Sequence, residues 1–283
     1  MRHHMFTALI NGLAVLAVAG CGGGGGGGST AGTSGTASSA SLAAASSTSP
    51  TASSGVSSTS GTSSTSTSTS SLPAVFSKFT SNVRVSVSGS TVVLETDDLP
   101  NHRSCYWPVT SSMYEPYTGS NPNFFQNPGS IQAQTLTFRI PLNPAQASDH
   151  QPTSLGPIGI SVNGVAIFNQ YNGGGQALTS EIDTFDQYEG HPANTTYHYH
   201  VEPTYLTQQN GKSALVGFLA DGFPVYGPME NGATVTNAML DSYHGHVGAT
   251  ADYPSGIYHY HVTAEDPYIN GGAYYGTPGS ISQ

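Results

Sequence analysis

The chain has 283 residues, of which 16 are acidic, 6 are basic and only 8% are charged. Polyphosphate partners require a basic surface, so a net charge of -10 excludes nucleic acid and disfavours an anionic membrane surface. The first 72 residues are rich in Gly, Ser and Thr, and the remainder has the size of one ordinary globular domain.

The amino terminus has the pattern of an export signal. An apolar run from Phe6 to Val18 leads to small residues before Cys21, which resembles a bacterial lipobox. We expect residues 1–20 to be a lipoprotein signal peptide and Cys21 to carry the lipid. The run is short for a membrane span, and cleavage before Cys21 is favoured over an ordinary secretory signal. Gly22 resembles the residue that follows the cysteine in lipoproteins sorted onward to the outer membrane. We therefore expect the protein to be in the cell envelope, anchored by its lipid to a bacterial outer membrane.

Residues 21–72 form the predicted tether. After a run of glycines the segment contains Ser, Thr, Ala and Gly with few apolar side chains, so it cannot bury enough surface to offset its ordering entropy. As a flexible coil it would reach roughly 40 Å. If Cys21 is lipidated, Cys105 has no intramolecular partner, and its aromatic neighbours indicate a buried structural thiol rather than a metal or catalytic thiol.

Residues 73–283 are predicted to form one mainly β domain. The segment Val83–Glu95 alternates around Gly89-Ser90 as a hairpin, and Thr135–Ile140 alternates as a further strand. Helical periodicity is scarce, and only Val235–Leu240 suggests a short helical turn. Gly and Pro punctuate the rest. We expect a sandwich or a distorted barrel with long Gly/Pro-rich loops.

Three elements recur in the same order, which indicates an internal duplication. The repeats lie near 158–203 and 216–264, and we expect two units related by a pseudo-twofold axis. The matched elements are Ile158–Phe168 with Val216–Tyr226, Asp186–His191 with Asp241–His246, and Tyr197–Val201 with Tyr258–Val262.

Each repeat ends in the same Tyr-His-Tyr-His strand. Side chains alternate along an extended strand, so the two histidines of each copy share one face and the two tyrosines share the other. Neutral imidazole is a common ligand of Zn, Cu, Ni and Fe, and a histidine from each Gly-His step would complete a three-histidine face. The candidate ligands are His191, His198 and His200 in the first repeat, and His246, His259 and His261 in the second.

These motifs resemble the YHYH-domain family of bacterial exported proteins. The resemblance rests on the two Tyr-His-Tyr-His strands, the two Gly-His steps, Asp221–Pro228 and Asp252–Ile257, and it covers roughly Phe79 to Pro278. The step Leu99–His102 is also similar to one near the start of that domain, which adds His102 to the candidate ligands. The resemblance names a family and implies no particular reaction.

Other residues are further candidates for the metal site. His244 lies two residues before His246, and Glu189 matches it in the first repeat, so the two sites are expected to be unequal. Asp186 and Asp241 are candidate ligands or acceptors that orient an imidazole. Asp221 is a candidate ligand too, although a turn residue before glycine is an equal interpretation. No catalytic residue is assigned.

The sequence leaves the function open between several classes. The favoured hypothesis is an envelope lipoprotein whose histidine-rich domain binds a transition metal, Zn or Cu. One alternative is a metal-dependent enzyme, either a zinc hydrolase or a copper oxidoreductase, and another is a metal-free module that binds carbohydrate or a protein partner through tyrosines. Without metal, the alternating Tyr and His side chains would form a hydrogen-bonded ladder that serves packing alone.

Overall fold

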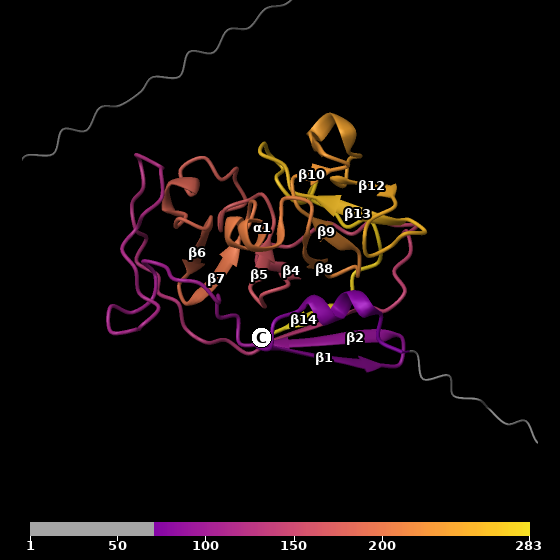
Figure 1. Cartoon of the computed structure of the whole chain (residues 1–283), viewed down its shortest axis with the longest axis horizontal. Coiled ribbons are helices and arrows are strands. Elements are labelled where there is room, and N and C mark those ends of the chain that lie inside the picture. Colours follow the sequence, from indigo (N-terminus) through magenta and orange to yellow (C-terminus); the bar gives the residue numbers. More distant parts are fainter. Residues whose placement is uncertain (1–70) are drawn as a thin grey trace, which may run out of the picture. The chain divides into compact units, whose positions relative to one another are not determined.

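The structure, a computed structural model, describes residues 71–283. The predicted signal peptide, the lipidation site at Cys21 and all but the last two residues of the predicted tether lie outside this range. The described chain is mainly β, which confirms the predicted class, and its helices are few and short (Figure 1).

A four-stranded antiparallel sheet forms one layer of the domain. Its order is β1-β2-β3-β14, and the first two strands are the predicted hairpin, which turns at Gly89 with a φ of 62°. That left-handed conformation suits glycine, which has no Cβ to oppose it. The strands are β1 (Val83–Ser88), β2 (Thr91–Thr96), β3 (Leu136–Pro141) and β14 (Ser280–Ser282).

An eight-stranded mixed sheet forms the second layer and carries the histidine motifs. Its order is β12-β13-β9-β8-β4-β5-β7-β6, and a separate two-stranded hairpin, β10-β11, lies in the loop after β9. The strands are β4 (Pro157–Ser161), β5 (Ala166–Phe168), β6 (Gly190–Ala193), β7 (Thr196–Tyr199), β8 (Leu215–Leu219), β9 (Pro224–Tyr226), β10 (Met229–Glu230), β11 (Ala233–Thr234), β12 (Gly245–Gly248) and β13 (Ile257–His261).

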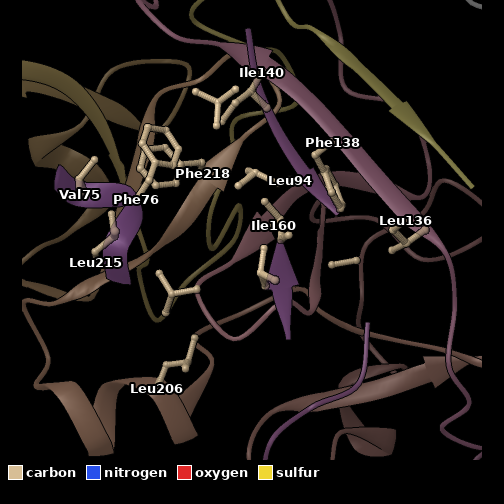
Figure 2. Close-up of a cluster of buried hydrophobic side chains, with 14 of the residues drawn as sticks. Val75, Phe76, Leu94, Leu136, Phe138, Ile140, Ile160, Leu206, Leu215 and Phe218 are labelled. Carbon is tan, nitrogen blue, oxygen red and sulfur yellow. The ribbon is translucent and has the colours of Figure 1, made fainter. Parts of the chain in front are cut away.

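The main apolar core lies between these two sheets. Leu94, Phe138 and Ile140 of the smaller sheet are in one buried cluster with Ile160 and Phe218 of the larger sheet (Figure 2). Neither β6 nor β12, at the two ends of the larger sheet, pairs with a further strand in residues 71–283, so this sheet stays open. The architecture is therefore a sandwich rather than a closed barrel.

The larger sheet has the same strand order when it is followed outward from its centre in either direction. β4, β5, β7 and β6 correspond in position to β8, β9, β13 and β12, and the pairing types match: β5 is parallel to β7, and β9 is parallel to β13. At the centre, Ile160 pairs with Phe218, while Gly159 pairs with Leu219 and Ser161 with Gly217. This register is what a twofold axis between Ile160 and Phe218 would produce. That the two units superpose stays a prediction.

The helical segments connect the strands without building a layer. The predicted turn near Val235–Leu240 is the 3₁₀ segment η3 (Asn237–Met239), and α1 (Thr204–Asn210) was not predicted. Two other 3₁₀ segments are η1 (Ala74–Lys78) and η2 (Ile182–Thr184). Within residues 71–283, no helix has the length and apolar character that crossing a bilayer requires.

The glycines at the centre of the larger sheet are predicted to be indispensable for packing. A Cβ at Gly217 would overlap the backbone of Ile160 in the neighbouring strand. We expect Gly217→Ala to lower the free energy of unfolding by about 1–3 kcal/mol, as overpacking does elsewhere. Gly173→Ala is the control, because a Cβ at Gly173 meets no atom within 4 Å. Thermal unfolding of both variants measures the difference, and equal melting temperatures would contradict this packing account.

Candidate metal centres

The backbone register places the histidines of both motifs on the face of the larger sheet that also carries the main core. His191 pairs with His198, His198 pairs with Ala166, and Ala166 pairs with Ile160 of the core. In the second half His246 pairs with His259, and His261 pairs with Tyr226. Directly paired residues point to the same side of a sheet. The alternation therefore brings each trio of histidines together, as the sequence predicts.

The tyrosines of the motifs occupy the opposite face and are buried there. Tyr197 packs its ring over Gly190, and Tyr258 packs over Gly245, so a Cβ on either glycine would overlap the tyrosine ring. The glycine of each Gly-His step thus leaves room for the tyrosine ring of the neighbouring strand. This contact fixes the strand from the side that faces away from the histidines.

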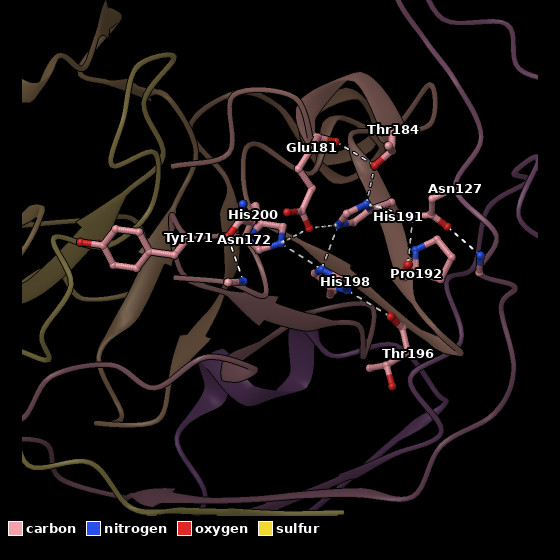
Figure 3. A network of polar contacts seen from close by, with 12 residues as sticks. Asn127, Tyr171, Asn172, Glu181, Thr184, His191, Pro192, Thr196, His198 and His200 are labelled. Carbon is pink, nitrogen blue, oxygen red and sulfur yellow. Dashed lines mark hydrogen bonds and ion pairs between the residues drawn. The ribbon is translucent and has the colours of Figure 1, made fainter. Parts of the chain in front are cut away.

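The first group contains Glu181, His191, His198 and His200 (Figure 3). The Nε2 atom of His198 lies 3.0 Å from Nε2 of His191 and 2.9 Å from Nε2 of His200. A carboxylate oxygen of Glu181 lies 3.3 Å from His191 Nε2 and 4.0 Å from His200 Nε2. The three rings and the carboxylate therefore converge on one point.

The second group contains Glu230, His246, His259 and His261, the matching residue types from the second repeat. The Nε2 atoms of His246 and His259 are 3.1 Å apart, and each lies 3.3 Å from an oxygen of Glu230. His261 Nε2 is buried and has no hydrogen-bond partner among the described residues. In both groups one ligand atom from every residue lies within 4.8 Å of the others.

Hydrogen bonds to the other ring nitrogen determine where each imidazole carries its proton. Nδ1 of His198 lies 3.0 Å from the carbonyl oxygen of Thr196, and Nδ1 of His200 lies 2.5 Å from that of Asn169. A carbonyl oxygen only accepts, so both Nδ1 atoms are protonated and both Nε2 atoms of the neutral rings hold lone pairs. The same reasoning applies to His259 and His261, whose Nδ1 atoms donate to the carbonyl groups of Ile257 and Gly227.

His191 adopts the same tautomer through a hydroxyl group. Thr184 Oγ1 donates to the carbonyl oxygen of Glu181, so it accepts the hydrogen bond from Nδ1 of His191 at 2.6 Å. The amide nitrogen of Asn127 lies farther from this Nδ1, at 3.3 Å, and donates to the carbonyl oxygen of Pro192 at 3.1 Å. Three Nε2 lone pairs consequently face one another in the first group. Neutral rings in this arrangement have no N–H proton between the facing Nε2 atoms. These nitrogen atoms therefore repel one another unless a cation lies between them.

Protonation of the histidines does not readily replace that cation, because the rings are buried. Desolvation holds the pKa of His198 well below its ordinary value, and the nearby His191 and His200 lower it further. Burial likewise lowers the pKa of His200 and of His261 to about 4. Burial raises the pKa of Glu181, but the hydrogen bond and positive charge that His191 supplies when it is protonated, together with the charge of a protonated His200, lower it on balance. The buried His198, His200 and His261 thus offer neutral nitrogens, each in a group that also contains a glutamate, and imidazole nitrogen and carboxylate oxygen are metal-ligand species.

The aspartates predicted as ligands are not in either group. Asp186 and Asp241 accept hydrogen bonds from the hydroxyl groups of Tyr197 and Tyr258, at 2.8 and 3.0 Å, on the tyrosine face. Each also accepts from the backbone N–H of the residue two positions on, which closes a tight turn. Asp221 accepts from Tyr260 at 2.6 Å and from the backbone of Phe223, so its turn interpretation fits this structure and its ligand interpretation does not.

The two additional histidines also lie outside the groups. His244 Nε2 contacts the hydroxyl of Thr263 at 3.0 Å, and burial lowers the pKa of His244 to about 4. His244 has a φ of 76° and its counterpart Glu189 a φ of 66°, so both occupy the same turn position. His102 Nε2 contacts the hydroxyl of Tyr199 at 3.0 Å, which places it with the tyrosines. Cys105 is buried, and burial raises its pKa to about 12, in agreement with a structural thiol.

The two glutamates were not among the predicted ligands. Glu181 precedes the Asp186 turn by five residues, whereas Glu230 precedes the Asp241 turn by eleven, so spacing within the repeats does not align them. Glu181 lies just before η2, and Glu230 belongs to the β10-β11 hairpin. Unlike elements therefore supply the same carboxylate to the two groups, and only the folded chain shows their equivalence.

The cavities beside the two groups differ in size and lining. A cavity of about 450 Å³ borders Glu230, His259 and His261 of the second group. The cavity that borders Glu181, His198 and His200 measures about 110 Å³. Tyr226 lines the larger cavity as well, whereas Tyr274 lines a different one.

The buried histidines predict how the stability of the metal-free protein depends on pH. The folded-state pKa of His200 and His261 is lowered to about 4, while the unfolded chain titrates near 6.5. Below pH 6.5 the unfolded state takes up protons that the folded state does not, so stability falls as pH decreases from about 6.5 to 4. Each ring contributes on the order of 2–3 kcal/mol to this loss.

Urea unfolding of chelator-treated protein at a series of pH values measures this dependence. The double variant His200→Phe, His261→Phe is the comparison, since rings that do not titrate should flatten the slope between pH 6.5 and 4. A slope that is the same in parent and variant would show that these imidazoles are not buried in the neutral form.

A protein-family model matches the part of the chain that contains the Tyr-His-Tyr-His motifs. The model of a family described as YHYH protein matches residues 137–237 and 229–273, a region that contains both groups and both Tyr-His-Tyr-His strands. No curated protein and no solved structure gives a significant match to the chain. The chain belongs to the YHYH protein family, as its paired Tyr-His-Tyr-His strands predict.

Proposed function

We propose that this protein binds two transition-metal ions, one in each histidine-glutamate group, with zinc or copper as the expected metals. One observation carries the proposal: the buried Nε2 atom of His198 faces Nε2 of His191 at 3.0 Å and Nε2 of His200 at 2.9 Å, with no proton between the neutral rings. Two nitrogens bound to one tetrahedral ion would lie about 3.3 Å apart, so a small expansion accommodates an ion with bonds of ~2.0–2.1 Å.

The residue types of both groups favour the same class of metal. Imidazole nitrogen together with carboxylate oxygen is a ligand set of Zn²⁺, and imidazole also suits Cu²⁺. Calcium and magnesium prefer sites made of oxygen atoms alone, which neither group offers. Each group carries one carboxylate and three neutral rings, so a divalent cation leaves a net charge of +1 in place of -1.

A metal-free ladder of tyrosine and histidine side chains explains less of the structure. It requires hydrogen bonds between the alternating side chains, yet each Tyr-His-Tyr-His strand places its tyrosines and histidines on opposite faces. It also requires a donor between each pair of Nε2 atoms. The Nδ1 hydrogen bonds of His198 and His200 leave none while the rings are neutral.

We further propose that the domain is held at the bacterial cell envelope, on the outer membrane, by a lipid on Cys21. The support is the lipobox-like run that ends at Cys21 and the Gly/Ser/Thr-rich composition of residues 22–71. In this arrangement the tether gives the metal-binding domain a reach of roughly 40 Å from the membrane.

Elemental analysis of the purified domain loaded with Zn²⁺ and gel-filtered tests the metal proposal. We expect two ions per chain in the parent, one in His198→Ala, His200→Ala, and one in His259→Ala, His261→Ala. Because metal binding contributes to folding, at a free Zn²⁺ concentration of 100 times Kd each occupied site adds about 2.7 kcal/mol to the free energy of unfolding.

His150→Ala is the matched control, because His150 contacts Tyr274 and Tyr243 and is in neither group. It should retain two ions and the parent's stabilisation by Zn²⁺. A parent domain that contains no ion, and whose melting temperature is unchanged by excess Zn²⁺ or Cu²⁺, would leave the metal-free ladder as the better account.

The anchor is tested by replacing the lipidated residue. Cys21→Ser should abolish fatty-acid labelling and move the protein from the membrane fraction to the released fraction. The domain should still fold, with a melting temperature equal to that of the parent, because Cys21 lies outside residues 71–283, whose side chains form three buried apolar clusters of their own. Membrane association that survives this substitution would refute the lipid anchor.

A further inference from the structure

The two metal groups differ in how far they are open to solvent. In the first group the side chain of His191 is 3% exposed and that of His200 is 2% exposed. In the second group the side chain of His246 is 27% exposed. His259 is 0% exposed, so the second group opens to solvent on the side of His246, whereas the histidines of the first group are all buried and its most exposed member is Glu181.

The hydrogen-bond partners of the ring nitrogens also differ between the groups. Each Nε2 of the first group lies within 3.0 Å of another Nε2, so the histidines close around one point. In the second group His261 Nε2 is buried and has no hydrogen-bond partner within residues 71–283, although it belongs to the same set of converging atoms. The ring centroids are 4.6–5.6 Å apart in the first group and 4.6–5.1 Å apart in the second, so the two groups are equally compact and differ in the unpartnered nitrogen of His261.

The larger cavity provides space for a ligand beside His261. It measures about 450 Å³, within the usual range for small-molecule sites, and His259 and His261 form part of its wall. Its other polar side chains include Ser213, Tyr226 and Asn231, which are uncharged. No Lys or Arg is among the described residues that line it, so a highly anionic ligand would find no cationic partner besides the metal.

The cavity beside the first group does not offer the same chemistry. It is about a quarter as large, at about 110 Å³, and its wall includes Leu155, Phe168 and Tyr171. The ring of Phe168 stacks on His198 with centroids 3.8 Å apart, which covers one side of that group. An ion in the first group would be held by protein ligands alone, as structural metal sites are.

We propose that the second group is a ligand-binding metal centre, whereas the first is a closed structural one. This inference rests on the proposed metal binding. The ion of the second group takes a small, uncharged molecule that donates an oxygen atom to it, and the hydroxyl and amide groups of the cavity hold the rest of that molecule. Duplication has thus produced one centre that supports the fold and one that meets an external ligand.

Cobalt-substituted full-length protein tests this division, because the visible absorption of Co²⁺ changes with its coordination. The probe is acetohydroxamic acid, which is uncharged in solution at pH 7 and releases its N-hydroxyl proton to solvent as its oxygen atoms bind the ion. We expect a saturable spectral change that corresponds to one of the two bound Co²⁺ ions. The change should persist in His198→Ala, His200→Ala and disappear in His259→Ala, His261→Ala.

Two matched variants locate the binding space without touching a ligand of the metal. Ala251 lines the larger cavity and Ala193 lines the smaller one, and both are exposed. Ala251→Trp should weaken binding of acetohydroxamic acid at least tenfold, and Ala193→Trp should leave it unchanged. Both variants should retain two Co²⁺ ions.

The possible results distinguish this inference from the metal-binding proposal on which it rests. Two bound ions with no spectral response, or with a response from the first group, would overturn the division while leaving metal binding intact. Binding that is unaffected by Ala251→Trp would overturn the assignment of the cavity, and inorganic phosphate that binds more tightly than acetohydroxamic acid would overturn the uncharged class of ligand. Protein without bound ions would overturn both.

Discussion

The candidate centres depend on hydrogen bonds between imidazole Nδ1–H groups and fixed acceptors of the backbone. Thr196, Asn169, Ile257 and Gly227 each present a carbonyl oxygen to one ring. These bonds fix both the orientation of the ring and its tautomer, so Nε2 becomes the free nitrogen in every case. Because the acceptors belong to the strands or to the residues just beyond them, the fold itself sets the chemistry of the group.

The tyrosine face supplies the rigidity that this arrangement requires. Tyr197 and Tyr258 cross over a glycine of the neighbouring strand and end on Asp186 and Asp241. Each aspartate also accepts backbone N–H groups in the turn before the Gly-His step, so one carboxylate joins the turn to the strand. The tyrosine, the aspartate and the glycine thus hold the backbone in place, while the histidines on the other face remain available to a ligand.

The sequence predicts the parts of this structure that depend on local periodicity. Alternation in Tyr197–His200 and Tyr258–His261 assigns the two faces correctly, and the hairpin around Gly89 follows from turn chemistry. The roles of Asp186, Asp241 and Asp221 could not be separated by periodicity, because a turn residue, a hydrogen-bond acceptor and a metal ligand all use the same carboxylate. Glu181 and Glu230 come from unlike elements, and only the tertiary arrangement brings them to the histidines.

The central claim is that a cation belongs between the facing Nε2 atoms, and a crystal structure of the Zn²⁺-loaded domain tests it most directly. Anomalous scattering at the zinc edge should show one ion in each group, bonded at ~2.0–2.1 Å to Nε2 of the three histidines, with a carboxylate oxygen of Glu181 as the fourth ligand in the first group and a solvent oxygen bound beside Glu230 in the second. Zinc bound only at surface sites, with the imidazoles of both groups unchanged and no ion between them, would contradict the account.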